Sequence, residues 1–372
     1  HNVAHSFPTR RSSDLLHRAR LCTFEIDERG DLVSAIDAGG AETRYAYDEE
    51  HYLVEERGPD RIVWRFVHRI EGGAKRCVES WGELEGQDVL ALLGAPEANA
   101  ARRPKGILHV ALAYGPGPFE TRMTDATGHL HTYVGNELGL VERYLDPSGY
   151  VTIHRYDAVG RMLSVVDGAG RTVRRRVDDR GRVAEVGTAT TSVRLDRDDE
   201  SSSTRTRMPG GALGKTTTRR GKPTTIDDGG AVTQAAYDDR GRNVQIEWPD
   251  GTADTLAYDA HGNLASYAVG DGRTFAYTFD VWGRPVKMVQ PSGATWDLAY
   301  DSRGDLTLLT GPLGQRVETG IDDARRIVRI ERSTGWVENR WVGAALVEQT
   351  HEDGTRFRLG WDASLRLSWI EN

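Results

Sequence analysis

A short aromatic turn motif recurs along this chain at an almost constant interval, and that interval restricts the possible folds more than any other feature. The motif is an aromatic residue, Asp, two variable residues, Gly and usually Arg or Asn. Four successive copies begin at Tyr237, Tyr258, Phe279 and Tyr300, each 21 residues after the one before. A fixed period of this length indicates a repeat architecture in which every copy builds the same small unit.

Further copies keep the register on both sides of these four. Clear copies begin at Tyr47 and Tyr156, and weaker ones begin at Ile26, Val177, Leu195, Thr217, Ile321, Trp341 and Trp361. The residues that we assign to the structural repeat motif are Tyr47, Asp48, Tyr156, Asp157, Gly160, Arg161, Tyr237, Asp238, Gly241, Arg242, Tyr258, Asp259, Gly262, Phe279, Asp280, Gly283, Arg284, Tyr300, Asp301 and Gly304.

Each repeat reads as a β-hairpin. In the unit that starts at Tyr237, apolar residues occupy alternate positions from Asn243 to Trp248, which is the period of a half-buried strand. Pro249-Asp250-Gly251 then predicts a tight turn, and 252–258 returns as the second strand. We expect strands of about seven residues, roughly 23 Å long.

The Asp-x-x-Gly element predicts the turn between adjacent hairpins. An Asp at the first turn position accepts a hydrogen bond from a backbone N–H two residues on, and Gly adopts positive φ at little steric cost. The Arg that follows has two possible partners, a neighbouring aromatic ring or a repeat Asp. The motif Tyr is expected to stack on its counterpart one repeat away.

Tandem hairpins that pair edge to edge stabilise one another, whereas a lone hairpin is marginal in water. The sequence therefore predicts an all-β fold, in which hairpin repeats of about 21 residues form one long, spiralling antiparallel sheet. The main alternative is a β-propeller, which needs about 40–45 residues for each four-stranded blade. The motifs show no alternation over two units, and this disfavours the propeller.

The repeats fall into two groups, at 16–60 and 124–372. The segment 61–123 departs from the register, and a helical or loop insertion is expected near 87–101, with Asp88 as N-cap and Pro96 as breaker. This insertion is either a specialised surface element or a tolerated loop. Residues 196–222 are rich in Ser, Thr, Arg and Asp and predict a mobile excursion.

The two ends of the sequence are treated separately. Residues 1–15 contain FPTRRSSDL, which resembles a translated sequencing adapter and does not continue the repeat. We expect this stretch to be an artefact without structure and exclude it from the fold. The last residues stop inside a repeat, so we also expect the C-terminus to be truncated.

Charge and composition argue against several classes of protein. The formal net charge is -8 with a pI near 5.8, which disfavours attraction of the whole chain to nucleic acid or anionic lipid. No apolar run is long enough to span a membrane, and no signal peptide is visible. Two cysteines, Cys22 and Cys77, do not make a disulfide framework.

No catalytic, cofactor or metal site emerges from the sequence. The repeat Asp residues recur at every turn, which favours turn capping over catalysis. His129 and His131 share a strand face but lack a third metal ligand, and 196–200 lacks the ligand spacing of a calcium loop. Nothing places a base beside Cys77. No nucleotide-binding or hydrolase motif occurs, so the chain is expected not to be an enzyme.

The aromatic-Asp-x-x-Gly-Arg unit with its Pro-x-Gly tip resembles the YD repeat of RHS proteins. The segments YAYDEEHYLVEE (45–56), RCVESWG (76–82), TDATGHLHTY (124–133) and DPSGY (146–150) are similar to core regions of bacterial RHS polymorphic toxins. The resemblance covers most of 24–60 and 124–372.

This resemblance implies a wall segment of a hollow shell that encloses a C-terminal toxin domain, which is absent here. It also implies a secreted, cell-surface or delivered protein whose partners are its own toxin domain and secretion-apparatus proteins, such as those of type VI secretion. Any enzymatic activity would then lie in the missing domain. The alternative is a cell-surface adhesion protein that binds carbohydrate by stacking Trp and Tyr on sugars, because Trp and Tyr are abundant.

Overall fold

The fold is one continuous antiparallel sheet. The computed structural model describes residues 22–95, 103–115, 119–209, 211 and 213–372. These residues form 32 strands and one four-residue helix, and each strand pairs with the next one in the sequence. The prediction of an all-β hairpin array is thus confirmed. The strands do not group into separate four-stranded blades, so the propeller alternative is wrong.

The first third of the sheet contains the longest strands and the helix α1 (Val89–Leu92). Its strands are β1 Cys22–Ile26, β2 Leu32–Asp37, β3 Glu42–Tyr47, β4 Leu53–Arg57, β5 Ile62–Glu71, β6 Ala74–Leu84, β7 Ile107–Tyr114, β8 Glu120–Thr124, β9 Leu130–Gly135 and β10 Val141–Leu145. The middle third contains β11 Val151–Tyr156, β12 Met162–Val166, β13 Thr172–Val177, β14 Val183–Gly187, β15 Ser192–Asp198, β16 Ser203–Arg207, β17 Leu213–Arg219, β18 Lys222–Asp228, β19 Ala231–Tyr237 and β20 Asn243–Glu247.

The last third repeats the hairpin most regularly. Its strands are β21 Ala253–Tyr258, β22 Leu264–Ala268, β23 Thr274–Phe279, β24 Pro285–Val289, β25 Thr295–Tyr300, β26 Leu306–Thr310, β27 Arg316–Ile321, β28 Ile327–Arg332, β29 Gly335–Val342, β30 Ala345–His351, β31 Arg356–Trp361 and β32 Leu367–Glu371. The repeat strands have five or six residues rather than the seven expected, because the turns at both ends use more of each 21-residue unit.

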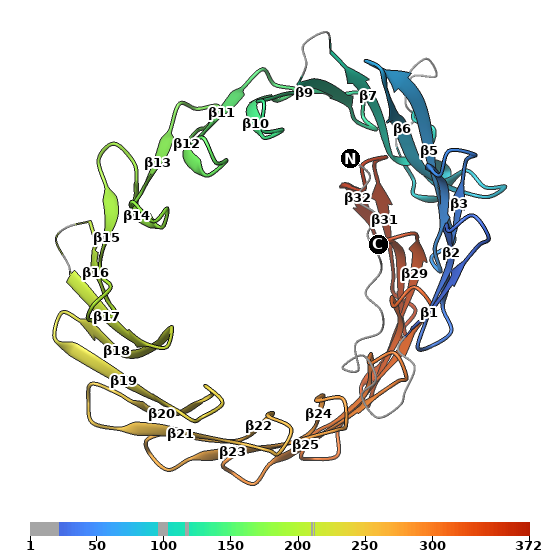
Figure 1. The fold of residues 1–372 in the computed structure, drawn as a ribbon. Coiled ribbons are helices and arrows are strands. Elements are labelled where there is room, and N and C mark those ends of the chain that lie inside the picture. Colours follow the sequence, from blue (N-terminus) through green and yellow to red (C-terminus); the bar gives the residue numbers. More distant parts are fainter. Residues whose placement is uncertain (1–21, 96–102, 116–118, 210, 212) are drawn as a thin grey trace.

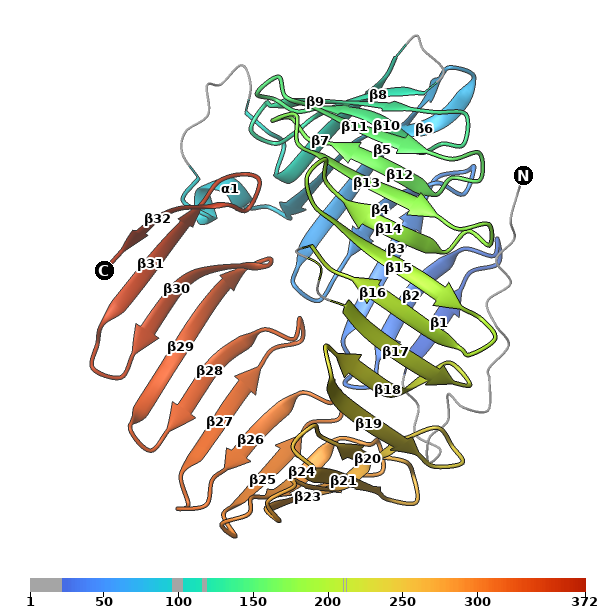
Figure 2. The same cartoon turned by 90° about the vertical axis from the view of Figure 1, so that its left-hand side faces the viewer.

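The sheet curls into an open ring, and its last strands pass inside its first strands (Figure 1). The side view shows the strands following one another around the wall as a spiral, with β29–β32 displaced along the ring axis from β1–β6 (Figure 2). We call this second turn of the spiral the second layer; it begins at the turn between β25 and β26, where Arg303 meets Gly39 of the first turn. A β-bulge recurs in most repeats just before the motif aromatic residue, as between Ala257 and Tyr258. Because a bulge bends and twists a strand, its regular recurrence accounts for the steady curvature of the wall.

Both edges of the wall use the same four-residue turn. At one edge Asp259 N–H donates to Asn263 O and Gly262 N–H donates to Asp259 O; at the other, Trp248 and Gly251 make the equivalent bonds. Where this turn occurs, its fourth residue has positive φ, including the copies in which the Gly is lost. There His51, Arg325 and Leu365 take φ values of 67°, 61° and 56°. The repeat register therefore fixes the backbone even where the sequence has diverged.

We predict that Gly262→Ala lowers the free energy of unfolding by about 1–2 kcal/mol, because a Cβ is strained at the φ of +98° found there. The control is Gly214→Ala in β17, where φ is not positive and the nearest atom to an added Cβ is Asp227 O at 3.6 Å. This control should be neutral or slightly stabilising. Denaturant unfolding checks both, and equal losses would contradict a conformational role for Gly262.

Two segments that were expected to break the hairpin repeat remain part of the sheet. Residues 196–222 were expected to form an excursion, and this is wrong: they build much of the hairpins β15–β18. The physical reason is that ladder pairing uses backbone groups, and alternating Thr residues fit strands well. The segment 61–123 also stays in the sheet, through the long pair β5–β6 and through β7 and β8.

The insertion near 87–101 contains α1, and Asp88 caps it by accepting from the N–H groups of Leu90 and Ala91. Pro96, the expected breaker, and residues 1–15, the expected artefact, lie outside the described residues. One side of the helix packs inward, because Val89, Leu90 and Leu93 are buried in the main hydrophobic cluster, while Ala91 and Leu92 remain exposed.

The main hydrophobic cluster lies where the second layer meets the first. It joins first-layer residues Ile62 and Ile107 and the helix region to second-layer residues such as Val342 and Ala363. Four hydrogen bonds cross the same junction: Leu108 N–H to Ala363 O at 2.7 Å, Trp361 N–H to Leu93 O at 2.9 Å, Trp369 Nε1 to Gly94 O at 3.2 Å, and Arg366 Nη2 to Thr127 Oγ1 at 3.3 Å. We call this junction, formed by 62–64, 84–95, 107–108, 126–127 and 342–369, the seam.

Candidate functional site

The repeat motif builds a connected ladder of turns, beginning with its Asp. In the turn at Asp238, Oδ1 accepts from the N–H groups of Arg240 and Arg242 at 3.0 and 2.8 Å, and Oδ2 accepts from Arg242 Nε at 2.7 Å. The backbone N–H of Arg242 is the main cause of the lowered pKa of Asp238; burial opposes it, and the guanidinium adds to it. The carboxylate is therefore engaged inside its own turn, which leaves it no free position for chemistry.

The motif Arg and Tyr connect one repeat to the next. The Arg242 guanidinium lies 4.5 Å from the centre of the Tyr258 ring, and Tyr258 Oη donates to Asn243 O at 2.7 Å. Arg284, Tyr300 and Pro285 repeat this arrangement at 4.7 and 2.8 Å. Both partners considered for the Arg are thus used together. The ring of Tyr258 packs on this Arg instead of on the Tyr of the neighbouring repeat.

The two faces of the sheet differ in chemistry. Directly opposed residues share a face, so the register places Leu256, Tyr267 and Phe275 together, then Tyr277, Met288 and Trp296, then Leu298 and Leu309. The motif Tyr residues lie on this same face, which we call the aromatic face. The other face of these strands carries small and polar residues such as Ala276, Lys287 and Asp297.

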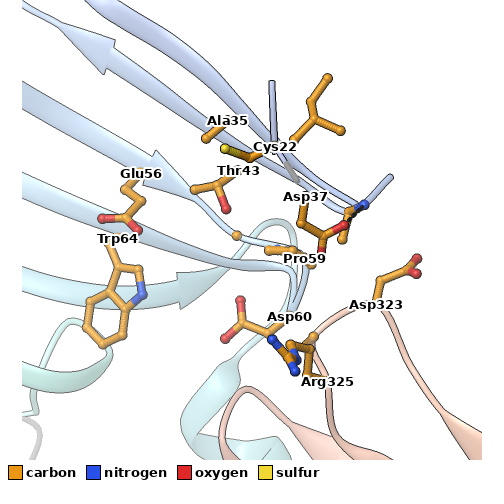
Figure 3. Close-up of a pocket in the computed structure, with 14 residues that line it drawn as sticks. Cys22, Ala35, Asp37, Thr43, Glu56, Pro59, Asp60, Trp64, Asp323 and Arg325 are labelled. Atoms are coloured by element: carbon orange, nitrogen blue, oxygen red, sulfur yellow. Dashed lines mark hydrogen bonds between the residues drawn. The ribbon is translucent and has the colours of Figure 1, made fainter. Parts of the chain in front are cut away.

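The aromatic face is the inner face of the ring. The register continues it through Tyr45 and Glu56 to Trp64, and Trp64 packs against the seam cluster. Figure 3 shows Ala35, Thr43, Glu56 and Trp64 along a crevice of about 460 Å³, with the second-layer turn of Asp323 and Arg325 opposite. Because the second layer passes inside the first (Figure 1), the face that it meets is turned inward.

An open apolar groove of about 580 Å³ runs along the aromatic face over β22–β26. Its lining is almost entirely apolar, with Tyr277, Met288 and Trp296 at the centre and Leu264, Phe279, Pro285, Gln290, Leu298 and Leu309 around them. Across β21–β26 the register gives this face one charged strand residue, Asp254. Such a surface offers area for apolar contacts and few polar groups to select one particular ligand.

Asp254 is the one feature of this face that sequence reasoning missed. Its side chain is buried, accepts from Tyr267 Oη at 2.5 Å and from Gly270 N–H at 2.9 Å, and has a lowered pKa, mainly because of the Tyr267 hydroxyl. The signal was a carboxylate at an apolar position of the strand pattern. Its hydrogen-bond donors lie on the neighbouring strand and turn, so the carboxylate has a structural role in joining them.

Of the other candidate residues, His129 and His131 lie near one shared carboxylate, with His129 Nδ1 and His131 Nε2 at 3.6 and 3.7 Å from Asp125 Oδ2. His131 Nδ1 lies 2.7 Å from Tyr144 Oη, and His129 Nδ1 lies 2.7 Å from Thr127 Oγ1. Asp198 Oδ2 accepts from Ser201 Oγ, and Cys77 is half-buried with its thiol 3.5 Å from Glu79 O. Within the described ranges no group of three or more His, Cys, Asp or Glu residues is suited to hold a metal ion. No helix in those ranges has the length and hydropathy needed to cross a membrane.

Comparison with known proteins agrees with the repeat. The Teneurin YD-shell family matches residues 213–351, and the RHS Repeat family matches 27–63 and 135–172. Together the matches cover more than half of the chain. The chain belongs to the RHS/YD-repeat family. The matched segments include both the regular hairpins of the last third and the weaker copies near the start, so the RHS/YD repeat extends over both layers of the wall.

One curated relative of this RHS/YD-repeat chain is "Probable deoxyribonuclease RhsB" of Dickeya dadantii. It is 27% identical over 165 residues, which are 44% of this chain and 10% of the relative. The crystal structure of TcdB2-TccC3 matches with a TM-score of 0.55 at 12% identity, over 93% of this chain and 23% of that one. The Tc holotoxin pore of Photorhabdus luminescens matches with a TM-score of 0.51 at 12% identity, over 94% and 23%.

These structures share the fold of the RHS/YD-repeat chain. The chain spans about a tenth of the curated relative and less than a quarter of the solved chains. It therefore aligns with only a part of each of these larger proteins.

Proposed function

We propose that this chain is a structural wall segment of an RHS shell that holds a polypeptide cargo, a C-terminal toxin domain, in a partly unfolded state. The observation that carries the proposal is the inward aromatic face with its apolar groove. An unfolded chain exposes apolar side chains that a folded domain buries, and an aromatic wall with few charges offers them many weak contacts. The toxin-related names of the relatives support the same role.

Several parts of this proposal come from the family. Any enzymatic activity would lie in the cargo domain, since the repeat carboxylates of Asp238, Asp259 and Asp280 are engaged inside their own turns. The intact protein would be secreted or delivered, with secretion-apparatus proteins as further partners. The carbohydrate-adhesion alternative predicts specific micromolar binding on a glycan array, whereas the cargo proposal predicts none through the inner groove.

The test compares two neighbouring residues on opposite faces of β24. Met288→Glu places a charge in the inner groove, and Val289→Glu places the same charge on the outer face. The probe is a permanently unfolded protein, reduced and carboxymethylated α-lactalbumin, titrated into the 372-residue chain. Because burying a Met side chain contributes about 1.5–3 kcal/mol, Met288→Glu should weaken binding at least about tenfold.

Val289→Glu should change that affinity by less than about twofold, since it leaves the groove intact. Thermal unfolding of both variants checks that the wall is still folded. Equal loss in the two variants, or no binding of the unfolded probe by the wild-type chain, would contradict the cargo-holding function.

A further inference from the structure

The segment 157–236 differs from the rest of the chain in a way that the cargo proposal does not use. It contains no Phe, Trp or Tyr. From Arg171 to Lys222 it has 14 Arg or Lys against 7 Asp or Glu, in a chain whose net charge is -8. Charge asymmetry of this size within one domain indicates an interaction with an anionic partner.

The sheet gathers these cations on one face. The register puts Arg174, Arg176, Arg194, Arg205, Arg207 and Lys215 on the face opposite the aromatic face, and all six are exposed. This outer face of β13–β17 is turned toward the viewer in Figure 2. We call these six residues the basic band. The acidic residues on the same face are Glu185, Asp196, Asp198 and Asp227, of which Asp196 lies directly opposite Arg205 and Asp227 directly opposite Lys215.

The band contains like charges in direct opposition. Arg194 lies directly opposite Arg207, and Arg205 lies directly opposite Lys215. Like charges at such positions are destabilising, because the Cβ atoms are only about 5 Å apart. Glu185 relieves Arg176 and Arg194, at 3.3 and 3.1 Å. Within the part of the chain that the structure describes, no ion pair at 4.0 Å or less involves Arg205, Arg207 or Lys215. An anionic ligand would remove this repulsion.

We propose that the basic band binds a flexible, linear polyanionic polysaccharide, sulfated or phosphorylated, on the outside of the wall. Five of its six cations are Arg, whose planar fork matches sulfate and phosphate oxygens. The band crosses five strands, which at about 4.8 Å each makes it roughly 20 Å long around the circumference. Its cations lie on β13, β15, β16 and β17, at intervals of one or two strand spacings along this arc. A polymer with closely spaced charges therefore contacts several of them at once.

Curvature selects a flexible partner. The second-layer residue Arg303 reaches Gly39 of the first layer after 23 strand steps. At about 4.8 Å per step the circumference is roughly 110 Å and the radius roughly 18 Å. A flat bilayer cannot follow so curved a surface and touches it along one line only. The same holds for a DNA duplex, because its persistence length is about 150 base pairs. Single-stranded nucleic acid would need aromatic platforms, and the band has none.

The experiment measures binding of heparin, the probe for a sulfated polysaccharide, to the 372-residue chain by calorimetry at increasing NaCl. The wild-type chain should bind in spite of its negative net charge. The triple variant Arg205→Gln, Arg207→Gln, Lys215→Gln removes three cations that make no ion pair, so it should fold normally. Its affinity should fall at least about tenfold, and the slope of log K against log salt should decrease by about two to three.

The control Arg316→Gln, Arg356→Gln, Arg358→Gln removes the same charge from the outer faces of β27 and β31, where Arg316 pairs with Glu318 and Arg358 with Glu348. Thermal unfolding checks that the control still folds. It should change heparin affinity by less than about threefold, since only a diffuse field is lost. The proposal is overturned if the control weakens binding as much as the band variant, or if the wild-type chain does not bind heparin. Tighter binding to phosphatidylserine vesicles or to duplex DNA than to heparin would also overturn it.

Discussion

Ile62→Ala is expected to lower the free energy of unfolding of the chain by about 2–5 kcal/mol. Ile62 is completely buried at the seam, where it contacts both layers. A Cβ added at Gly343 would lie only 2.9 Å from Ile62 Cγ1, so the two layers pack closely at this point. The truncation leaves a cavity between the layers, and urea unfolding followed by Trp fluorescence measures the loss.

The control for this prediction lies on the same strand. Ile70 is 78% exposed, so Ile70→Ala removes the same atoms without making a cavity and should cost less than about 0.5 kcal/mol. If both variants lost the same stability, the seam would not hold the layers together. An unfolding transition that split into two steps in Ile62→Ala alone would show that the second layer detaches first.

Acid is expected to destabilise the wall progressively between about pH 4 and pH 2. The turn carboxylates of Asp157, Asp167 and Asp238 have lowered pKa values, caused first by the backbone N–H of the residue four positions on. The Lys75 ammonium is the main cause that lowers the pKa of Asp48 to about 2. Since the folded pKa lies below the unfolded one, this stability is complete above the unfolded pKa of about 4 and is lost as the pH falls.

The effect accumulates because the same turn recurs along the chain. Circular dichroism melting curves over this pH range measure it, and the midpoint should fall steeply below about pH 4. Asp238→Asn should lower the midpoint at neutral pH and make the fall in acid smaller, since one of the titrating turns is removed. A melting midpoint that stayed constant down to about pH 2 would contradict the role of the turn carboxylates.

The regular hairpins could be predicted from the sequence because their cause is local. Asp259, Gly262 and the alternating apolar residues between them and Phe279 each act within one repeat, and the spacing places them unambiguously. The strands in 196–222 were not recognised from the sequence. Their exposed face carries charged side chains, which gives the segment the composition of a loop. The glycine-free turns at Arg325 and Leu365 kept their shape because neighbouring hairpins impose it.

The seam was not predictable from local pattern. Leu93 and Trp361 lie 268 residues apart and meet only after the sheet has curled through a full turn. The direction of the aromatic face depends on the same closure, because Trp64 shows which way the face turns only through its second-layer contacts. Sequence periodicity reports which residues share a face, and the long-range packing decides which face is inside.

The central claim is that the aromatic face holds a cargo polypeptide inside the wall. The most direct measurement is site-specific photo-crosslinking in the full-length product of the gene that encodes this chain, with benzoylphenylalanine at position 288 or at position 289. The account predicts that Met288→benzoylphenylalanine crosslinks to the C-terminal domain and that Val289→benzoylphenylalanine does not. Crosslinking from the outer position alone, or from neither position, would contradict it.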